Sequence, residues 1–127
     1  MKLSVVITTR NEAANIANCI HAFDAVRDEV EVIVVDNAST DDTKKIAADL
    51  GATVLDKGPE RCAQRNLGWQ MAKAEWVIVL DADMILPQET IKEMLGIAGR
   101  GQDLGRKTED GRPDLVSKVS SPLAYWI

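Results

Sequence analysis

Apolar and polar residues alternate along the chain in blocks of two kinds. Four short blocks are almost continuously apolar and rich in β-branched residues, at positions 3–8, 30–35, 52–55 and 76–80. Runs of this length and composition are typical of strands that are buried on both faces of a parallel sheet. The pattern therefore predicts four strands at these positions.

Blocks with helical spacing follow each of these strands. The apolar residues that define the four expected helices are Ile16, Ile20 and Phe23; Ile46, Ala47 and Leu50; Ala63, Leu67 and Met71; and Ile91, Met94 and Leu95. Ser39 or Thr40 is expected to cap the second helix, and Gly51 to end it in a left-handed conformation. The third helix is predicted over residues 60–73, and Pro87 suits the first turn of the fourth. This order predicts a three-layer α/β/α fold with a mostly parallel sheet and right-handed crossovers.

Length and composition suit a single globular domain. The chain has 127 residues, of which 46% are hydrophobic and 28% charged, and this is enough for one core. The alternating pattern stops at residues 99–114, which contain four glycines and mixed charges. We therefore expect an α/β domain over residues 1–98, followed by a flexible loop and a short C-terminal segment over residues 99–127.

Charge and apolar content argue against several classes of partner. A net charge of −5 argues against nucleic acid, whose phosphates need a basic protein face. No run reaches the ~18 apolar residues of a membrane span, and residues 3–7 are too short for a signal-peptide core. Cys19 and Cys62 lack metal-ligand spacing and are expected to be free thiols. Together these features predict a cytoplasmic protein.

Polar residues gather where three of the predicted strands end. These clusters are residues 8–12 (T-T-R-N-E), residues 36–40 (D-N-A-S-T) and residues 81–83 (D-A-D). The carboxyl ends of parallel strands meet at one edge of the sheet, and ligands of open α/β sheets bind outside that edge. The three clusters are therefore expected to converge on one site.

Asp81 and Asp83 are the metal candidates within these clusters. Two carboxylates two residues apart at a strand end point the same way and repel each other, and a divalent cation relieves that repulsion. Mg²⁺ or Mn²⁺ commonly binds one or two carboxylates together with substrate phosphates. The alternative is that the pair lies in a solvated loop or caps the helix expected near Pro87.

Other residues have both a binding and a structural interpretation. Asp36 could accept a hydrogen bond from a base or a ribose, or cap the following helix. Arg65 could stack on a base or bind a phosphate, or lie on a solvated helix face. Gly68 inside a helix costs about 1 kcal/mol relative to Ala, which indicates close packing or a nearby ligand. Trp69 and Trp76 are interpreted as packing residues.

Four segments, taken in order, resemble the family 2 glycosyltransferases, which have the Rossmann-like GT-A fold of nucleotide-diphospho-sugar transferases. The segments are S-V-V-I-T-T-R-N-E, V-V-D-N-A-S-T-D-D-T, Q-R-N-L-G-W and V-I-V-L-D-A-D. The resemblance covers residues 2–98, and the order and spacing of the four segments make it specific. It implies that residues 1–98 form a nucleotide-sugar-binding domain.

The resemblance also implies roles for individual residues. It implies metal-dependent, inverting hexosyl transfer from a UDP- or GDP-linked sugar, with Mg²⁺ or Mn²⁺ as the cofactor. The residues whose family counterparts bind the donor are Thr8, Thr9, Glu12, Asp36, Arg65 and Asp81. Of these, Asp36 and Arg65 correspond to contacts with the base. Asp83, with Asp81 beside it, would hold the metal, which neutralises the leaving diphosphate.

The chain departs from the family pattern in two ways. The acidic pair that is common after the second strand is here Asp36-Asn37, and no segment matches the acceptor half of the site. The acceptor and the general base are therefore not assigned, because Glu109, Asp110 and Asp114 fall in the expected loop.

There are two alternatives to an active transferase, the first because of these departures and the second because of the acidic strand ends. A truncated or non-catalytic nucleotide-sugar-binding module would leave part of its sheet uncovered, expose apolar surface and self-associate as a homo-oligomer. A receiver-like phosphoacceptor domain would also carry acidic strand ends. That fold needs an acidic pair after the first strand, where this chain has Thr8-Thr9-Arg10.

Overall fold

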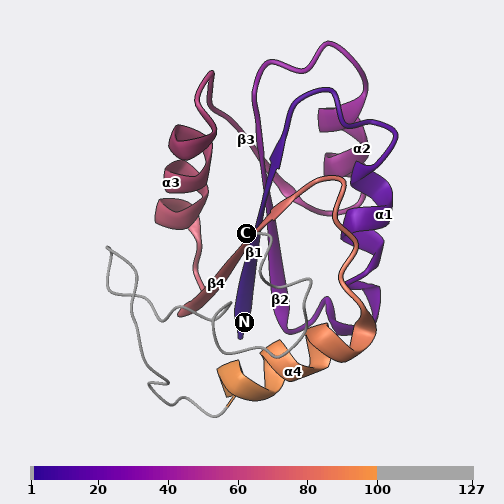
Figure 1. Cartoon of the computed structure of the whole chain (residues 1–127), viewed down its shortest axis with the longest axis vertical. Helices are drawn as coiled ribbons and strands as arrows, with labels where there is room; N and C mark the ends of the chain where they lie inside the picture. Colours follow the sequence, from indigo (N-terminus) through magenta and orange to yellow (C-terminus); the bar gives the residue numbers. More distant parts are fainter. Residues whose placement is uncertain (1, 100–127) are drawn as a thin grey trace.

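The computed structural model describes residues 2–99, which contain a four-stranded sheet; Figure 1 shows its arrangement. Its strands are β1 (Leu3–Thr9), β2 (Val30–Asp36), β3 (Thr53–Asp56) and β4 (Trp76–Asp81). They lie in the order β3-β2-β1-β4, and every neighbouring pair is parallel. The four predicted strands are therefore confirmed. Asp81 is the last residue of β4.

Helices cover both faces of the sheet, which confirms the three-layer prediction. They are α1 (Ile16–His21), the short 3₁₀ helix η1 (Asp24–Val26), α2 (Thr43–Asp49), α3 (Arg61–Met71) and α4 (Gln88–Gly99). Side chains of α1, α2 and α4 share one core cluster with Val5 and Ile7 of β1. The other face, which includes Val6, packs against α3 (Figure 1). Successive residues of β1 point to opposite faces, so one strand supplies both cores.

Helix α3 packs against the sheet through Gln64 and Gly68, which are buried, and through Leu67, which is half-buried against the same core cluster. The predicted apolar face is therefore right at Leu67 and wrong at Met71, which is 50% exposed. A Cβ atom added to Gly68 would lie 2.3 Å from Cγ1 of Val6, which confirms the expectation of close packing there. Trp76 is buried in the core, as predicted.

The start of α2 also differs from the prediction. The helix begins at Thr43, and neither Ser39 nor Thr40 caps it. Instead, the carboxylate of Asp41 accepts a hydrogen bond from the Thr43 backbone N–H at 3.0 Å. At the other end, Gly51 has φ of 85°, which confirms the predicted left-handed position.

Within residues 2–99, strands β1, β2 and β4 are buried along almost their whole length, whereas the edge strand β3 is exposed or half-buried. The large apolar side chains exposed in this part of the chain are Met71 and Ile85, and neither belongs to a strand. The apolar sheet surface expected of a self-associating module is therefore not seen. None of the helices over residues 2–99 has the length and apolar character needed to cross a membrane. The predicted loop and C-terminal segment, with Glu109, Asp110 and Asp114, lie outside the described residues.

Candidate functional site

The strand order reverses beside β1, and this places the site. The chain runs from β1 outward through β2 and β3, and then returns to add β4 on the opposite side of β1. In open α/β sheets, ligands bind outside the carboxyl ends of the strands at such a reversal. The register brings these ends to one level, because Thr8 pairs with Asp81 and Thr9 pairs with Asp36.

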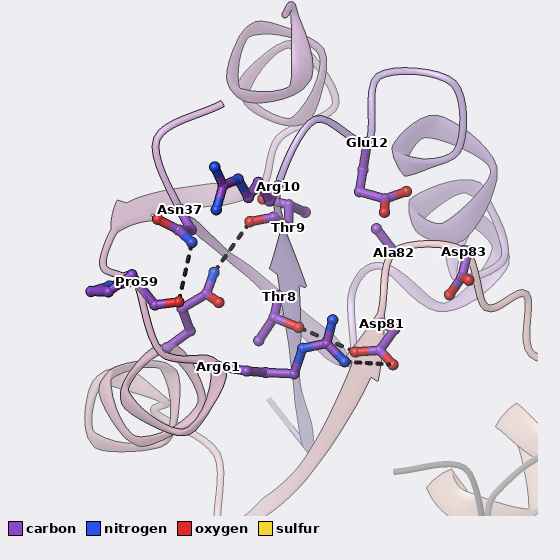
Figure 2. A pocket seen from close by; sticks show the side chains of 11 residues that line it. Thr8, Thr9, Arg10, Glu12, Asn37, Pro59, Arg61, Asp81, Ala82 and Asp83 are labelled. Atoms are coloured by element: carbon purple, nitrogen blue, oxygen red, sulfur yellow. Dashed lines mark hydrogen bonds and ion pairs between the residues drawn. The ribbon is translucent and has the colours of Figure 1, made fainter. Parts of the chain in front are cut away.

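A pocket of about 360 Å³ opens at this edge. Its volume lies within the range of small-molecule sites. Figure 2 shows its lining side chains, which come from the ends of β1, β2 and β4 and from the start of α3: Thr8, Thr9, Arg10, Glu12, Asn37, Pro59, Arg61, Gln64, Asp81, Ala82 and Asp83. All three strand-end clusters therefore contribute to this pocket, the second of them through Asn37 alone.

The predicted site residues divide into two groups by their position. Thr8, Thr9, Glu12, Asp81 and Asp83 all line the pocket. The other two predicted residues, Asp36 and Arg65, do not line it. Asp36 instead borders a second hollow of about 470 Å³, and Asn37 is common to both.

The carboxylate of Asp81 is held between β1 and α3. Oδ1 accepts a hydrogen bond from the hydroxyl of Thr8 at 3.3 Å, and Oδ2 lies 3.6 Å from a guanidinium nitrogen of Arg61 (Figure 2). The sequence interpretation missed Arg61. The available signal was its place at the start of a helix that follows β3, which brings it to the same edge of the sheet.

The carboxylate of Asp36 is entirely buried and fully engaged. It accepts hydrogen bonds from the Thr9 hydroxyl at 2.6 Å, the Ser39 backbone N–H at 2.9 Å and the Ser39 hydroxyl at 2.5 Å. In this structure Asp36 therefore joins the end of β1 to the loop after β2. The contact of Asp36 with a base stays a prediction.

Backbone-to-side-chain hydrogen bonds hold the loops after β1 and β2 together. The backbone N–H of Asn11 donates to the Ser39 hydroxyl at 2.8 Å, and the Asn11 side-chain oxygen accepts from the Thr40 N–H at 2.8 Å. One residue on, the N–H of Glu12 donates to the Thr43 hydroxyl at 2.9 Å. Asn11 has φ of 53°, a left-handed conformation that Asn tolerates better than most residues. These bonds fix the Glu12 backbone at the rim of the pocket.

Gln64 is a second residue that the sequence interpretation missed. It is 4% exposed, and its side-chain N–H₂ donates to the backbone oxygens of Thr9 at 3.2 Å and Val35 at 2.9 Å. One amide of α3 thus ties together the carboxyl ends of β1 and β2. Its signal in the sequence was the four-residue spacing to Gly68, which places both residues on one face of the helix.

Arg65 is partly buried on α3, and its Nε atom is buried without a hydrogen-bond partner. It lies one turn beyond Arg61, farther from the start of the helix. Of these two arginines, Arg61 is the one that lines the pocket. The contact of Arg65 with a base stays a prediction.

Three carboxylates give one part of the pocket a negative field, and the thiol of Cys19 responds to it. Burial, and then the charges of Asp83, Asp81 and Glu12, raise the pKa of Cys19 to about 12. The thiol is therefore neutral at physiological pH. Its sulfur lies 4.0 Å from the backbone oxygen of Asp81, directly behind the strand end.

Within residues 2–99, no group of three or more His, Cys, Asp or Glu side chains is arranged to hold a metal ion. Asp81 and Asp83 can still supply the one or two carboxylates that Mg²⁺ requires when phosphates and water complete its coordination. The guanidinium beside Asp81 shows that this carboxylate already attracts a cation. The donor set therefore fits a hard divalent ion that arrives with a phosphate ligand.

The fold and the pocket define a Rossmann-like α/β domain with a ligand site at its strand-order reversal. The chain belongs to glycosyl transferase family 2, whose sequence profile matches residues 4–105. It is 44% identical over 94 residues to an uncharacterized glycosyltransferase of Rickettsia prowazekii, covering 73% of this chain and 32% of that protein. The chain thus spans about a third of the length of this relative.

Solved structures show the same GT-A architecture. TarS of S. aureus superposes with a TM-score of 0.71 at 26% identity, over 85% of this chain and 38% of TarS. TarS has also been crystallised with UDP. Glucosyl-3-phosphoglycerate synthase of Mycobacterium tuberculosis, in complex with Mn²⁺, UDP and glucosyl-3-phosphoglycerate, superposes with a TM-score of 0.62 at 30% identity, over 74% of this chain and 38% of that enzyme.

Proposed function

We propose that this domain binds a nucleoside diphosphate sugar together with Mg²⁺ or Mn²⁺, as the donor half of an inverting hexosyltransferase. The observation that carries the proposal is the convergence of Thr8, Glu12, Asp81 and Asp83 on one pocket at the strand-order reversal. Family membership and the UDP-bound structural neighbours support it.

The two ends of the pocket differ in chemistry, and this orients the donor. Asn37 and Pro59 form one end, while Glu12, Asp81 and Asp83 gather at the other (Figure 2). We assign the nucleoside to the first end, where an amide and a proline ring offer neutral contacts. The diphosphate is assigned to the second end.

Charge explains why the diphosphate needs a metal here. A diphosphate brought beside Glu12, Asp81 and Asp83 meets three carboxylates of its own sign. Bound there, Mg²⁺ or Mn²⁺ supplies Lewis-acid stabilisation of the leaving diphosphate. Asp83 and Asp81 would hold the ion, Thr8 keeps the Asp81 carboxylate oriented at 3.3 Å, and the Arg10 and Arg61 guanidiniums add positive charge to the same pocket.

Calorimetry with UDP and GDP, with and without Mn²⁺, tests donor binding. We expect micromolar binding of one nucleotide that requires Mn²⁺, and at least a ~10-fold loss in Asp83→Asn, equivalent to about 1.4 kcal/mol. Asp28→Asn is the matched control, because Asp28 is exposed in the loop before β2 and does not line the pocket. The proposal is wrong if neither nucleotide binds, or if Asp83→Asn and Asp28→Asn behave alike.

Turnover is a separate step of the proposal. Hydrolysis of UDP-glucose to glucose and UDP needs a donor site and water but no sugar acceptor. Inversion of an α-linked donor predicts β-glucose as the first product, which ¹H NMR distinguishes from the α-anomer before mutarotation. Detection of α-glucose as the first product would contradict the inverting assignment while leaving donor binding intact.

A further inference from the structure

Arg61 reaches across the pocket to the carboxylate that the proposed metal would use. It is the first residue of α3, and its guanidinium points over the end of β1 toward Asp81 (Figure 2). One guanidinium nitrogen lies 3.6 Å from Oδ2 of Asp81, while Oδ1 is engaged by Thr8. The guanidinium therefore occupies the open side of this carboxylate.

The geometry of the Arg61–Asp81 ion pair favours replacement of the guanidinium by another cation, and the pair adds little to the stability of the fold. The Arg61 side chain is 62% exposed and that of Asp81 is 32% exposed, and the separation of 3.6 Å is long for a charged hydrogen bond. Exposed pairs of this kind contribute little to folding. A divalent cation bound to Oδ2 and the guanidinium cannot occupy the same side of Asp81.

We infer that Arg61 is an exchangeable counter-ion, which neutralises Asp81 in the free domain and moves to the donor diphosphate when a metal binds Asp81. This inference rests on the proposed function. Arg61 suits both states because its planar guanidinium binds carboxylate and phosphate oxygens with the same pair of N–H donors. Its place at the beginning of α3 keeps it beside the pocket in either state.

The exchange predicts effects of opposite sign for one substitution. Arg61→Gln removes the cation that competes for Asp81, so Mn²⁺ alone should bind about 3- to 10-fold more tightly. The same substitution removes a diphosphate ligand, so UDP in the presence of saturating Mn²⁺ should bind about 10-fold more weakly. A residue that only maintained the shape of the pocket would weaken both equilibria.

Electron paramagnetic resonance of free Mn²⁺ measures the first equilibrium, and calorimetry with UDP measures the second. Arg27→Gln is the matched control, since it makes the same charge change and Arg27 contacts the backbone oxygen of Gly51, away from the pocket. Arg61→Lys keeps the charge but not the planar donor pair, and we expect it to retain weak Mn²⁺ binding with reduced UDP affinity. Circular dichroism and thermal unfolding confirm that each variant is folded.

The outcomes separate this inference from the proposed function. If wild-type protein binds UDP with Mn²⁺ and Asp83→Asn weakens that binding at least ~10-fold, the donor site stands. In that case, an Arg61→Gln variant that weakens Mn²⁺ binding, or leaves it equal to that of Arg27→Gln, overturns the exchange. If wild-type protein binds no nucleotide with Mn²⁺, the proposed function and the inference fail together.

Discussion

Asp36 and Asp81 end the two strands that flank β1, and their carboxylates differ in burial and in hydrogen bonding. Asp36, at the end of β2, is 0% exposed and accepts three hydrogen bonds from Thr9 and Ser39. Asp81, at the end of β4, is partly exposed, with one hydrogen bond from Thr8 and a long ion pair to Arg61. The carboxylate of Asp36 is thus satisfied by bonds within the protein, whereas the carboxylate of Asp81 can still accept a further ligand.

This difference indicates how the site is assembled. The hydrogen bonds among residues 9–12 and 36–43 connect the end of β1 and the loop behind it to the end of β2 and the loop that follows it. The β4 edge keeps Asp81 and Asp83 accessible, which a metal and its phosphate ligands require. Asp36 and Ser39 of D-N-A-S-T thus connect the loops of this structure, while Asn37 of the same segment and Asp81 and Asp83 of D-A-D line the pocket.

The largest effect on the free energy of unfolding is expected at Asp36. Asp36→Ala leaves the Thr9 hydroxyl and the Ser39 N–H without their buried acceptor, so the free energy of unfolding should fall by about 3 kcal/mol. Asp83→Ala is the contrasting variant, since Asp83 is exposed, and it should change stability by less than about 0.5 kcal/mol. Urea denaturation measures both values. Equal losses in the two variants would remove the distinction between the edges.

A smaller effect is expected at Gln64, which joins β1 to β2 from the side of α3. Gln64→Leu keeps the approximate volume but removes the donors to the oxygens of Thr9 and Val35, so stability should fall by about 2 kcal/mol. UDP affinity should fall as well, because the ends of β1 and β2 lose the hydrogen bonds from Gln64 that connect them. Gln70→Leu, on the exposed side of the same helix, is the control. If Gln70→Leu lowers stability as much as Gln64→Leu does, the loss does not come from the hydrogen bonds of Gln64.

The sequence predicted the strands and the carboxylates well because both follow from local patterns. Continuous apolar runs mark strands buried on two faces, and Thr8, Asp81 and Asp83 line the pocket because parallel strands bring their ends to one edge. The burial of Asp36 was not predictable, since it depends on Ser39 folding back across the strand end.

Helical spacing alone did not identify Arg61 as the arginine that lines the pocket. Both Arg61 and Arg65 lie on α3, and they are four residues apart, so helical spacing alone does not separate them. The position of α3 on the sheet determines which of the two arginines lines the pocket. That position depends on the close contact of Gly68 with Val6, which is possible because glycine has no Cβ atom.

The smallest predicted effect is a pH dependence arising behind the β4 edge. The pKa of Cys19 is about 12 in the folded protein, against 9.0 for an ordinary thiol. Because the folded pKa is raised, the stability from this thiol is fully present below pH 9 and declines as pH rises toward 12. Between pH 8 and pH 10 the loss should be about 1.4 kcal/mol.

The measurement is the difference in free energy of unfolding between wild type and Cys19→Ala, taken by urea denaturation at pH 8 and at pH 10. The difference isolates Cys19, because the other titrating groups are common to both proteins. Cys62→Ala, at an exposed position on α3, is the control and should leave the pH dependence of the wild type unchanged. A constant difference between wild type and Cys19→Ala would mean that the thiol ionises equally in both states. In that case neither the burial of the thiol, which is the larger cause, nor the charges of Asp83, Asp81 and Glu12 would raise the pKa of Cys19 in the folded protein.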